Sequence, residues 1–360
     1  MNLSKIFCQT NAVNTLTRAF DTGRIPHAYI FEGIEGIGKY TTALAWSKLL
    51  LCKNPKDNEA CGKCESCKMF DLDSHPDFHH VYKELIQLNK DANKRKRQAI
   101  DLPIDVIRDF LVEKVQLKPT LSASKVFVVS EAEKLNAESQ NLLLKTLEEP
   151  PDKSFIILLC TKLDNLLPTT KSRCQVVHFG PLDEEKIIEK LSGGQESKFW
   201  ARLTGGSLGQ SELFTKLEPS FYETKKEFLN RFSKFQTADC VDFAQWINST
   251  ASELAASWQK IKADTSKSDL SRQAKKLFIL VLISAFVDAM KISFAGAEKM
   301  TNFDQPAQVK LLADRFGQEG CAEKIDCCYE AIRFIDASVN EKLVFEHLLL
   351  NCADSGIIKV

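Results

Sequence analysis

The sequence predicts an α/β core, a five-stranded parallel sheet with helices on both faces. Uninterrupted apolar runs, such as 126–129, alternate along the chain with segments of helical spacing. Such runs are typical of parallel strands that are buried on both faces. A glycine-rich loop at 33–39 also follows the first strand and precedes the first helix. The strands are expected at 28–31, 78–82, 125–131, 155–161 and 176–179.

Helices are expected between these strands, because apolar residues there recur every three or four positions. Asn136 can cap one of these helices at its N-terminus, and Pro150 and Pro151 stop it. The expected helices are 2–24, 41–51, 104–115 and 137–149.

The composition predicts a cytoplasmic protein without a strong overall charge. Lys plus Arg and Asp plus Glu number 48 each, so no global field drives the chain onto nucleic acid or a membrane. The most apolar run, 277–287, is far shorter than the roughly 20 residues that cross a bilayer, and it predicts a buried helix. Residues 1–9 lack the apolar segment of an export signal. Without such a signal, the twelve cysteines indicate free thiols and a metal site rather than disulfides.

The loop at 33–39 contains most of the residues that define a phosphate-binding loop. Its three glycines would let backbone N–H groups face phosphate oxygens, and Lys39 would reach the β- and γ-phosphates. The usual pattern ends in Ser or Thr, whose hydroxyl binds magnesium, but here the position is Tyr40. The sequence therefore predicts a loop shaped for a triphosphate that lacks one magnesium ligand.

Two strand ends carry the other residues expected at this site. Phosphate-loop proteins place Asp-Glu after the third strand, and this chain has Ser130-Glu131 there. A second magnesium ligand is thus missing, although Glu131 keeps the position of the residue that polarises water. The fourth strand ends at Thr161, near the expected γ-phosphate. The candidate nucleotide-binding residues of this degenerate site are Gly33, Gly36, Gly38, Lys39, Glu131 and Thr161.

Four cysteines lie close together in a turn-rich segment, with the spacing C-x8-C-x2-C-x2-C. Four thiolates at this spacing can surround one tetrahedral Zn²⁺ and leave no open position, so the predicted zinc site is structural. His75, His79 and His80 lie nearby, but a complete cysteine shell gives them no place as ligands. The predicted ligands are Cys52, Cys61, Cys64 and Cys67.

The segment 90–97 is rich in basic residues and has no apolar period. A solvated loop is the preferred interpretation. The alternative is contact with DNA phosphates, which would make the affinity salt-dependent. The sequence leaves open whether the wider insert, 83–101, meets DNA.

Several sequence segments resemble those of a known protein family. Residues 23–31, the degenerate loop, the four-cysteine insert, residues 141–151 and the Ser172-Arg173-Cys174 motif match it. On these residues the chain resembles the delta-prime family of bacterial DNA polymerase III clamp-loader subunits, in the AAA+ superfamily. The resemblance spans the chain and is strongest from 20 to 180.

The resemblance implies three domains. An AAA+ core at 1–180 would include the zinc module at 52–67. A small helical lid at 181–217 would follow, and then an all-helical collar at 218–360 through which five subunits form a ring.

The resemblance also implies roles for single residues. Active relatives carry an arginine in the lid that touches the γ-phosphate, but near that position this chain has Gly209 and Gln210. Arg173 would be an arginine finger that acts in trans on ATP held by a neighbouring subunit, with Ser172 in the same site. The alternative for Arg173 is an ordinary surface salt bridge.

The expected function is that of a non-motor, delta-prime-like clamp-loader subunit. It would serve Mg-ATP on a neighbouring subunit while the sliding clamp is loaded onto primed DNA, and its own binding of ATP or ADP would be weak or absent. The implied partners are the gamma/tau and delta subunits, with the beta clamp and primed DNA reached through the complex. One alternative is a gamma/tau-like subunit that hydrolyses ATP itself. Another is a zinc-bearing nucleic-acid module that binds DNA alone through 94–97.

Overall fold

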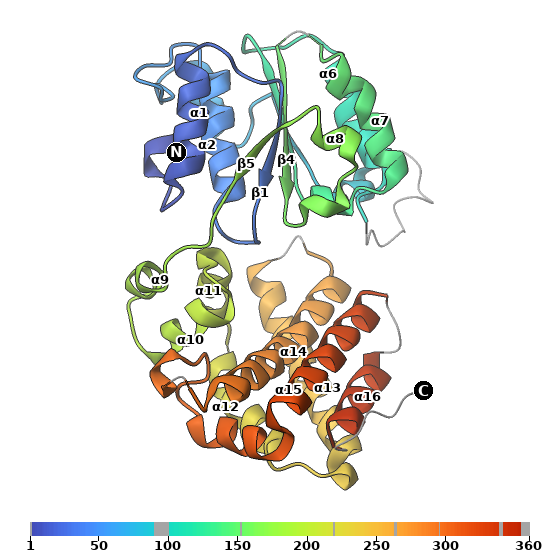
Figure 1. Ribbon diagram of the computed structural model, residues 1–360. Helices are drawn as coiled ribbons and strands as arrows, with labels where there is room; N and C mark the ends of the chain where they lie inside the picture. Colours follow the sequence, from blue (N-terminus) through green and yellow to red (C-terminus); the bar gives the residue numbers. More distant parts are fainter. Residues whose placement is uncertain are drawn as a thin grey trace. The chain divides into compact units, whose positions relative to one another are not determined.

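The chain divides into two compact units, each with its own core. The computed structural model describes residues 2–89, 101–151, 153–218, 220–262, 265–294, 296–337 and 341–353. The first unit comprises Met1–Leu182 with Ser207–Gly209, and the second comprises Asp183–Gly206 with Gln210–Val360. Figure 1 labels helices of both units and strands β1, β4 and β5 of the first unit.

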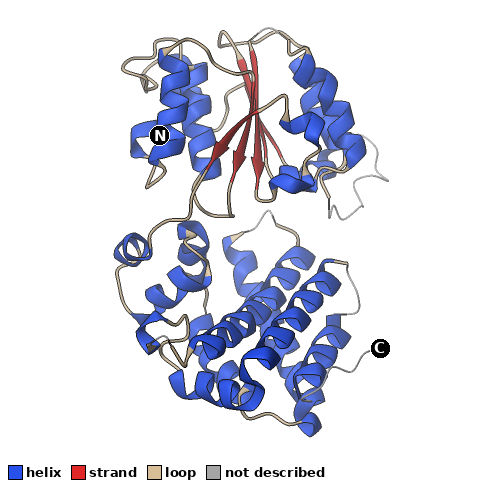
Figure 2. Ribbon diagram, in the orientation of Figure 1, coloured by secondary structure: helices blue, strands red, loops and turns tan. Residues whose placement is uncertain are grey.

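The first unit is built on a parallel sheet of five strands in the order β2-β3-β4-β1-β5. Ile30 of β1 pairs with Leu158 of β4 on one side and with Val176 of β5 on the other. Figure 2 shows the sheet between two layers of helices, so the predicted fold class is confirmed. The strands are β1 (Ala28–Glu32), β2 (Phe78–Val81), β3 (Lys125–Val129), β4 (Ser154–Cys160) and β5 (Gln175–His178).

Helices cover both faces of this sheet. Helices α1 (Thr10–Asp21) and α2 (Lys39–Leu51) lie on one side, and α7 (Ala137–Glu148) lies on the other (Figure 1). Asn136 caps α7 as predicted, because its side chain accepts a hydrogen bond from the backbone N–H of Ser139 at 2.8 Å. The shorter helices are α3 (Glu65–Asp71) and α8 (Pro168–Lys171), with 3-10 turns at Leu3–Lys5, Lys83–Leu88, Ala132–Lys134 and Leu163–Asn165.

Two predicted helices differ from the structure. The helix expected at 2–24 begins only at Thr10, because the backbone turns at Cys8, which has a φ of 55°. The helix expected at 104–115 contains a wider π-helical turn at Arg108–Val112, between α5 (Ile104–Ile107) and α6 (Glu113–Val115). Apolar residues keep helical spacing through this stretch, so nothing in the sequence marks the wider turn.

Both faces of the sheet are buried, which explains why the strands are continuously apolar. Phe127 and Leu158 pack in a cluster with Leu143 of α7 on one face. On the other face Tyr29 meets Trp46 of α2 edge to face, with ring centroids 6.0 Å apart. The phosphate-loop segment between β1 and α2 is thus held by two well-packed elements.

Asp77, just before β2, fastens the loop that leads into β3. Its carboxylate is buried and accepts the backbone N–H groups of Thr120, Leu121 and Ser122 at 2.6, 2.8 and 2.7 Å. Burial alone would raise the pKa of this carboxyl, but these hydrogen bonds outweigh it and lower the pKa below its usual value. The ionised carboxylate is therefore the form that stabilises the fold.

We expect Asp77→Ala to lower the free energy of unfolding by about 3–5 kcal/mol at pH 7, because three buried N–H groups lose their acceptor. The folded pKa is depressed, so this stabilisation is present above the unfolded pKa, about 4, and is lost as the pH falls through the folded value. Denaturant titrations from pH 7 to pH 2 measure it, with Asp164→Ala at an exposed site as the control. A difference from wild type that does not shrink toward pH 2 would contradict the prediction.

The second unit is entirely helical in the residues that the structure describes. The predicted buried helix at 277–287 lies within α14, and no described helix has both the length and the apolar character that a membrane crossing requires. Helix α11 (Leu208–Thr215) has its first two residues in the first unit. The other helices are α9 (Glu184–Lys190), α10 (Gln195–Leu203), α12 (Phe221–Phe232), α13 (Cys240–Ile261), α14 (Lys267–Lys291), α15 (Pro306–Asp336) and α16 (Glu341–Ala353).

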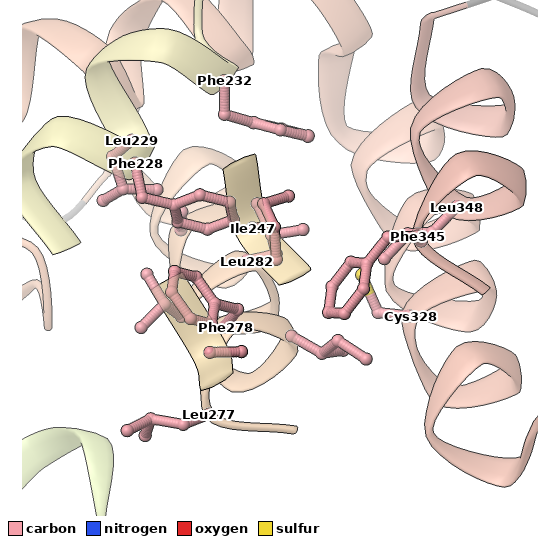
Figure 3. Packing of buried hydrophobic residues seen from close by; sticks show 14 of the residues in the cluster. Phe228, Leu229, Phe232, Ile247, Leu277, Phe278, Leu282, Cys328, Phe345 and Leu348 are labelled. Carbon is pink, nitrogen blue, oxygen red and sulfur yellow. The ribbon is translucent and has the colours of Figure 1, made fainter. Parts of the chain in front are cut away.

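Aromatic and aliphatic side chains from helices α10 to α16 fill the core of this unit, and Figure 3 shows part of it. Phe228 of α12 meets Phe278 of α14 edge to face, with ring centroids 5.1 Å apart. Lys225 and Asp304 form a buried ion pair at 2.6 Å beside this core. The division into a lid at 181–217 and a collar at 218–360 stays a prediction.

Candidate functional site

The phosphate loop lies between β1 and the N-terminus of α2, as the sequence predicts. Gly36 and Gly38 have φ values of 79° and 99°, and Gly38 precedes the first residue of α2. A Cβ at Gly33 would lie 2.5 Å from the carbonyl oxygen of Phe179, so only glycine fits there. The three glycines thus allow the backbone conformation of this loop.

Lys39 is turned onto the loop itself. Its Nζ donates to the carbonyl oxygens of Gly33 at 2.5 Å and Ile34 at 2.7 Å, and the residue is buried. Burial lowers the pKa of this lysine, while Glu133 and Glu35 oppose the change. The cation that would meet a triphosphate is therefore engaged by two of the loop's own carbonyls.

Residues 207–209 close on the same loop. The Ser207 hydroxyl donates to the carbonyl oxygen of Glu35 at 2.6 Å, and the N–H of Gly209 donates to that of Gly36 at 2.8 Å. A Cβ at position 209 would lie 2.9 Å from the Gly36 oxygen. The glycine that stands near the expected lid arginine therefore permits a close backbone contact with the loop.

The two positions that lack magnesium ligands are linked through a histidine of β2. His80 Nε2 lies 2.8 Å from Ser130 Oγ, and its Nδ1 lies 3.4 Å from the Tyr40 hydroxyl. The Tyr40 and His80 ring centroids are 4.8 Å apart. Burial lowers the pKa of His80 to about 4, so the ring is neutral at pH 7. A neutral, hydrogen-bonded imidazole ring thus connects Tyr40 and Ser130.

The remaining two residues of the predicted nucleotide site also have partners in the protein. Glu131 pairs with Lys134, and its carboxylate lies 3.6 Å from Lys83 Nζ. The Thr161 hydroxyl donates to Glu133 at 2.5 Å. The structure therefore brings all six predicted residues to one edge of the sheet, and the side chains of Lys39, Glu131 and Thr161 each bond to other groups of the protein.

Arg173 lies on the surface just after α8. Its Nη1 donates to the carbonyl oxygen of Thr169 at 2.9 Å and lies 3.4 Å from Ser172 Oγ. Its Nη2 lies 2.5 Å from the Glu148 carboxylate at the end of α7. The side chain keeps 33% of its exposure, so solvent and a neighbouring protein can reach it.

Gln140 of α7 fixes the segment that leads to Arg173. Its buried side chain accepts the backbone N–H of Leu167 at 2.7 Å and donates to the carbonyl oxygens of Leu135 and Asn165. The Thr170 hydroxyl of α8 lies 3.3 Å from the same Gln140 oxygen. Sequence reasoning missed Gln140, Glu148 and His80, because their roles depend on which elements become neighbours.

The four predicted zinc ligands gather at one point. Their Sγ atoms all lie within 4.8 Å of one another, and the Cys52–Cys64 and Cys61–Cys67 pairs are 4.0 Å apart. Zinc–sulfur bonds of about 2.3 Å at tetrahedral angles place sulfur atoms about 3.8 Å apart, so the set fits one zinc ion. Backbone N–H groups of Lys63 and Cys64 lower the pKa of Cys61 to about 6, which favours the thiolate. All twelve cysteines are described and free, as predicted.

The three histidines near the cysteines bind elsewhere. His75 Nε2 lies 2.9 Å from Ser66 Oγ, and His79 stacks on Phe127 with centroids 4.7 Å apart. The metal-competent cluster in the described residues includes neither of them, nor His80. The basic segment 90–97 lies outside the described residues.

Comparison with known proteins identifies relatives of this chain. Residues 8–183 match the family model described as DNA polymerase III, delta subunit. The chain is 25% identical to DNA polymerase III subunit delta' of Bacillus subtilis strain 168 over 346 residues, 95% of both chains. It is 28% identical to subunit delta' of Escherichia coli K12 over 343 residues, 93% of this chain and 91% of that one.

A second group of relatives matches over a shorter region. DNA polymerase III subunit tau/gamma of Haemophilus influenzae is 33% identical over 184 residues, 51% of this chain and 24% of that one. The two delta' subunits are thus similar to this chain over more than nine-tenths of its length. This chain belongs to the delta-prime (delta') family of DNA polymerase III subunits.

Proposed function

We propose that this chain is a non-motor subunit of the DNA polymerase III clamp loader, and that it supplies Arg173 in trans to the ATP site of a neighbouring subunit. One contrast carries the proposal. Lys39, the lysine of the chain's own phosphate loop, donates its hydrogen bonds to carbonyl oxygens of that loop. Arg173, in contrast, lies at the surface and keeps N–H donors that can bind an anion. An arginine that faces a γ-phosphate stabilises the charge that spreads over its oxygens during transfer to water.

The losses in the phosphate loop support this division of labour. Magnesium neutralises the developing charge in phosphoryl transfer, and Tyr40 and Ser130 cannot supply its usual ligands. Lys39 would also have to leave two carbonyl oxygens before it could meet a phosphate. Binding of ATP or ADP by this chain is therefore weak or absent, and the Mg-ATP that Arg173 serves is held by the neighbour.

The gamma/tau-like alternative, in which this chain hydrolyses ATP, has less support. It would need the magnesium ligands that the chain lacks, and the tau/gamma relative matches only about half of the chain. The proposed partners are the gamma/tau and delta subunits, with the beta clamp and primed DNA met through the complex, in the cytoplasm. A separate DNA-binding module is disfavoured by the zero net charge.

The zinc module is proposed as a structural part of the core. Its four cysteines would complete the metal's coordination shell and leave no open position for substrate. The proposed domain roles follow the family. An AAA+ core at 1–180 carries Arg173, a lid spans 181–217, and a collar at 218–360 joins the subunits.

We expect Lys39→Ala to leave ATP turnover by the reconstituted loader within about twofold of wild type, because Lys39 bonds to the loop rather than to a nucleotide. The purified wild-type chain alone should show no magnesium-dependent turnover above background. Phosphate release with and without the clamp and primed DNA measures both.

The same lysine substitution in the phosphate loop of the motor subunit provides the positive control. If Lys39→Ala abolished turnover in the assembled loader, or if the pure chain consumed ATP by itself, the gamma/tau-like function would replace the one proposed.

A further inference from the structure

Arg173 is held by a cradle made from two helices. The carbonyl oxygen of Thr169 in α8 accepts a hydrogen bond from Arg173 Nη1, and the Ser172 hydroxyl lies 3.4 Å from the same nitrogen. The Glu148 carboxylate of α7 forms an ion pair with Nη2. Glu148 and Thr169 lie on different helices. The carboxylate therefore ties the direction of the guanidinium to α7, not only to the loop that carries it.

Helix α7 is suited to this task. Gln140 fixes α8 through Leu167 and Thr170, and Glu148 lies eight residues further on, about 12 Å along the helix axis. Glu148 is the last residue of α7, where the helix dipole is negative and attracts a cation. Helix α7 thus contacts both the segment that leads to Arg173, through Gln140, and the guanidinium itself, through Glu148.

The cradle orients Arg173 without using all of its donors. A guanidinium has five N–H bonds. The three contacts of Arg173 leave the Nε–H and one Nη2–H without an acceptor among the described residues. Two such donors are enough to meet two oxygens of a phosphate.

The Glu148–Arg173 ion pair can orient the guanidinium but is too weak to keep it from binding a phosphate. Both side chains are substantially exposed, at 47% for Glu148 and 33% for Arg173. An exposed ion pair is weak because water screens it and both side chains lose rotamer freedom. A triphosphate at a subunit interface carries more charge than one carboxylate, so Glu148 would not keep the guanidinium away from it.

We infer that Glu148 is a positioning residue for Arg173, holding the guanidinium in the direction needed to reach a phosphate on the adjoining subunit. This inference rests on the proposed function of Arg173. A group that acts only on the orientation of a transition-state contact changes kcat and leaves KM and subunit assembly unaltered.

The test uses the reconstituted loader with Glu148→Gln, which keeps the size of the side chain and removes its charge. We expect kcat at the adjoining ATP site to fall about tenfold, with KM and assembly within twofold of wild type. Glu149→Gln, an exposed carboxylate one residue further on, is the matched control and should be normal. The thermal midpoint of the isolated chain checks that each variant folds.

A double-variant comparison separates the possible outcomes. Glu148→Ala should have no further effect in an Arg173→Ala background, because a positioning residue acts through its arginine. A rise in kcat for Glu148→Gln would overturn the inference in favour of a restraining contact. Normal kcat for Glu148→Gln beside a defective Arg173→Ala would overturn it while leaving the proposed function intact. Normal turnover with Arg173→Ala would instead overturn the proposed function itself.

Discussion

Replacing Arg173 with alanine is expected to lower ATP turnover at the adjoining subunit's site about 10³-fold or more, the range typical of an arginine finger. The physical reason is the loss of a fixed positive charge beside the γ-phosphate oxygens at the moment when negative charge spreads over them. Thr169, Ser172 and Glu148 already orient the guanidinium, so little reorganisation is needed on assembly. Single-turnover phosphate release by the complete loader, with clamp and primed DNA, measures the effect.

Two further variants show whether the charge or only the side chain matters. Arg173→Lys keeps a charge but not the planar fork, and it should recover only part of the lost rate. Lys171→Ala removes a neighbouring cation of α8 and should leave turnover unchanged. Wild-type turnover with Arg173→Ala, in a loader shown to be fully assembled, would assign Arg173 to a surface salt bridge with Glu148.

The sequence was sufficient for the sheet, because its strands are buried on both faces and contain unbroken apolar runs. Val126–Val129 and Ile156–Leu159 could be placed for that reason. Strand ends were shifted by one or two residues, because they depend on pairing. Gln175 joins β5 because it pairs with Tyr29, a partner that lies far away in the sequence.

The sequence showed which magnesium ligands are missing from the candidate site, but not which contacts the residues at those positions make instead. Tyr40 and Ser130 can be recognised from position alone as missing magnesium ligands. Their connection through His80 depends on β2 pairing with β3, which places His80 opposite Val128, two residues before Ser130. Composition and spacing could not indicate that pairing, so His80 was weighed only as a possible metal ligand.

The same limit applies to the charged residues. Lys39 fits the sequence pattern of a phosphate-binding lysine, but its contact with the Gly33 carbonyl depends on the folded loop. Glu148 was identifiable only as part of a family motif. Its place beside Arg173 depends on α7 and α8 being held together, partly by the buried amide of Gln140.

Cys67→Ser is expected to abolish stoichiometric zinc binding and to lower the stability of the first unit. Cys67 is fully buried, and its Sγ lies 4.0 Å from that of Cys61. At a free zinc concentration 1,000 times the dissociation constant, the bound metal contributes about 4 kcal/mol to the free energy of unfolding. For a unit of this size that corresponds to about 8–16 °C in the thermal midpoint.

The zinc module should transmit this loss to the core, because it is bonded to elements on both sides. Ser66, beside Cys67, donates to the carbonyl oxygen of Leu51 at the end of α2, and the Glu59 carboxylate accepts the backbone N–H of Leu3 at 3.1 Å. A chelator should therefore lower the midpoint of the wild type by a similar amount and leave Cys67→Ser unaffected. Cys8→Ser, at a half-buried cysteine of the same unit, is the control and should keep one zinc per chain by elemental analysis. The zinc site would be contradicted if the wild type contained well under one zinc per chain and Cys67→Ser had an unchanged thermal midpoint. The four cysteines would then be ordinary packing residues.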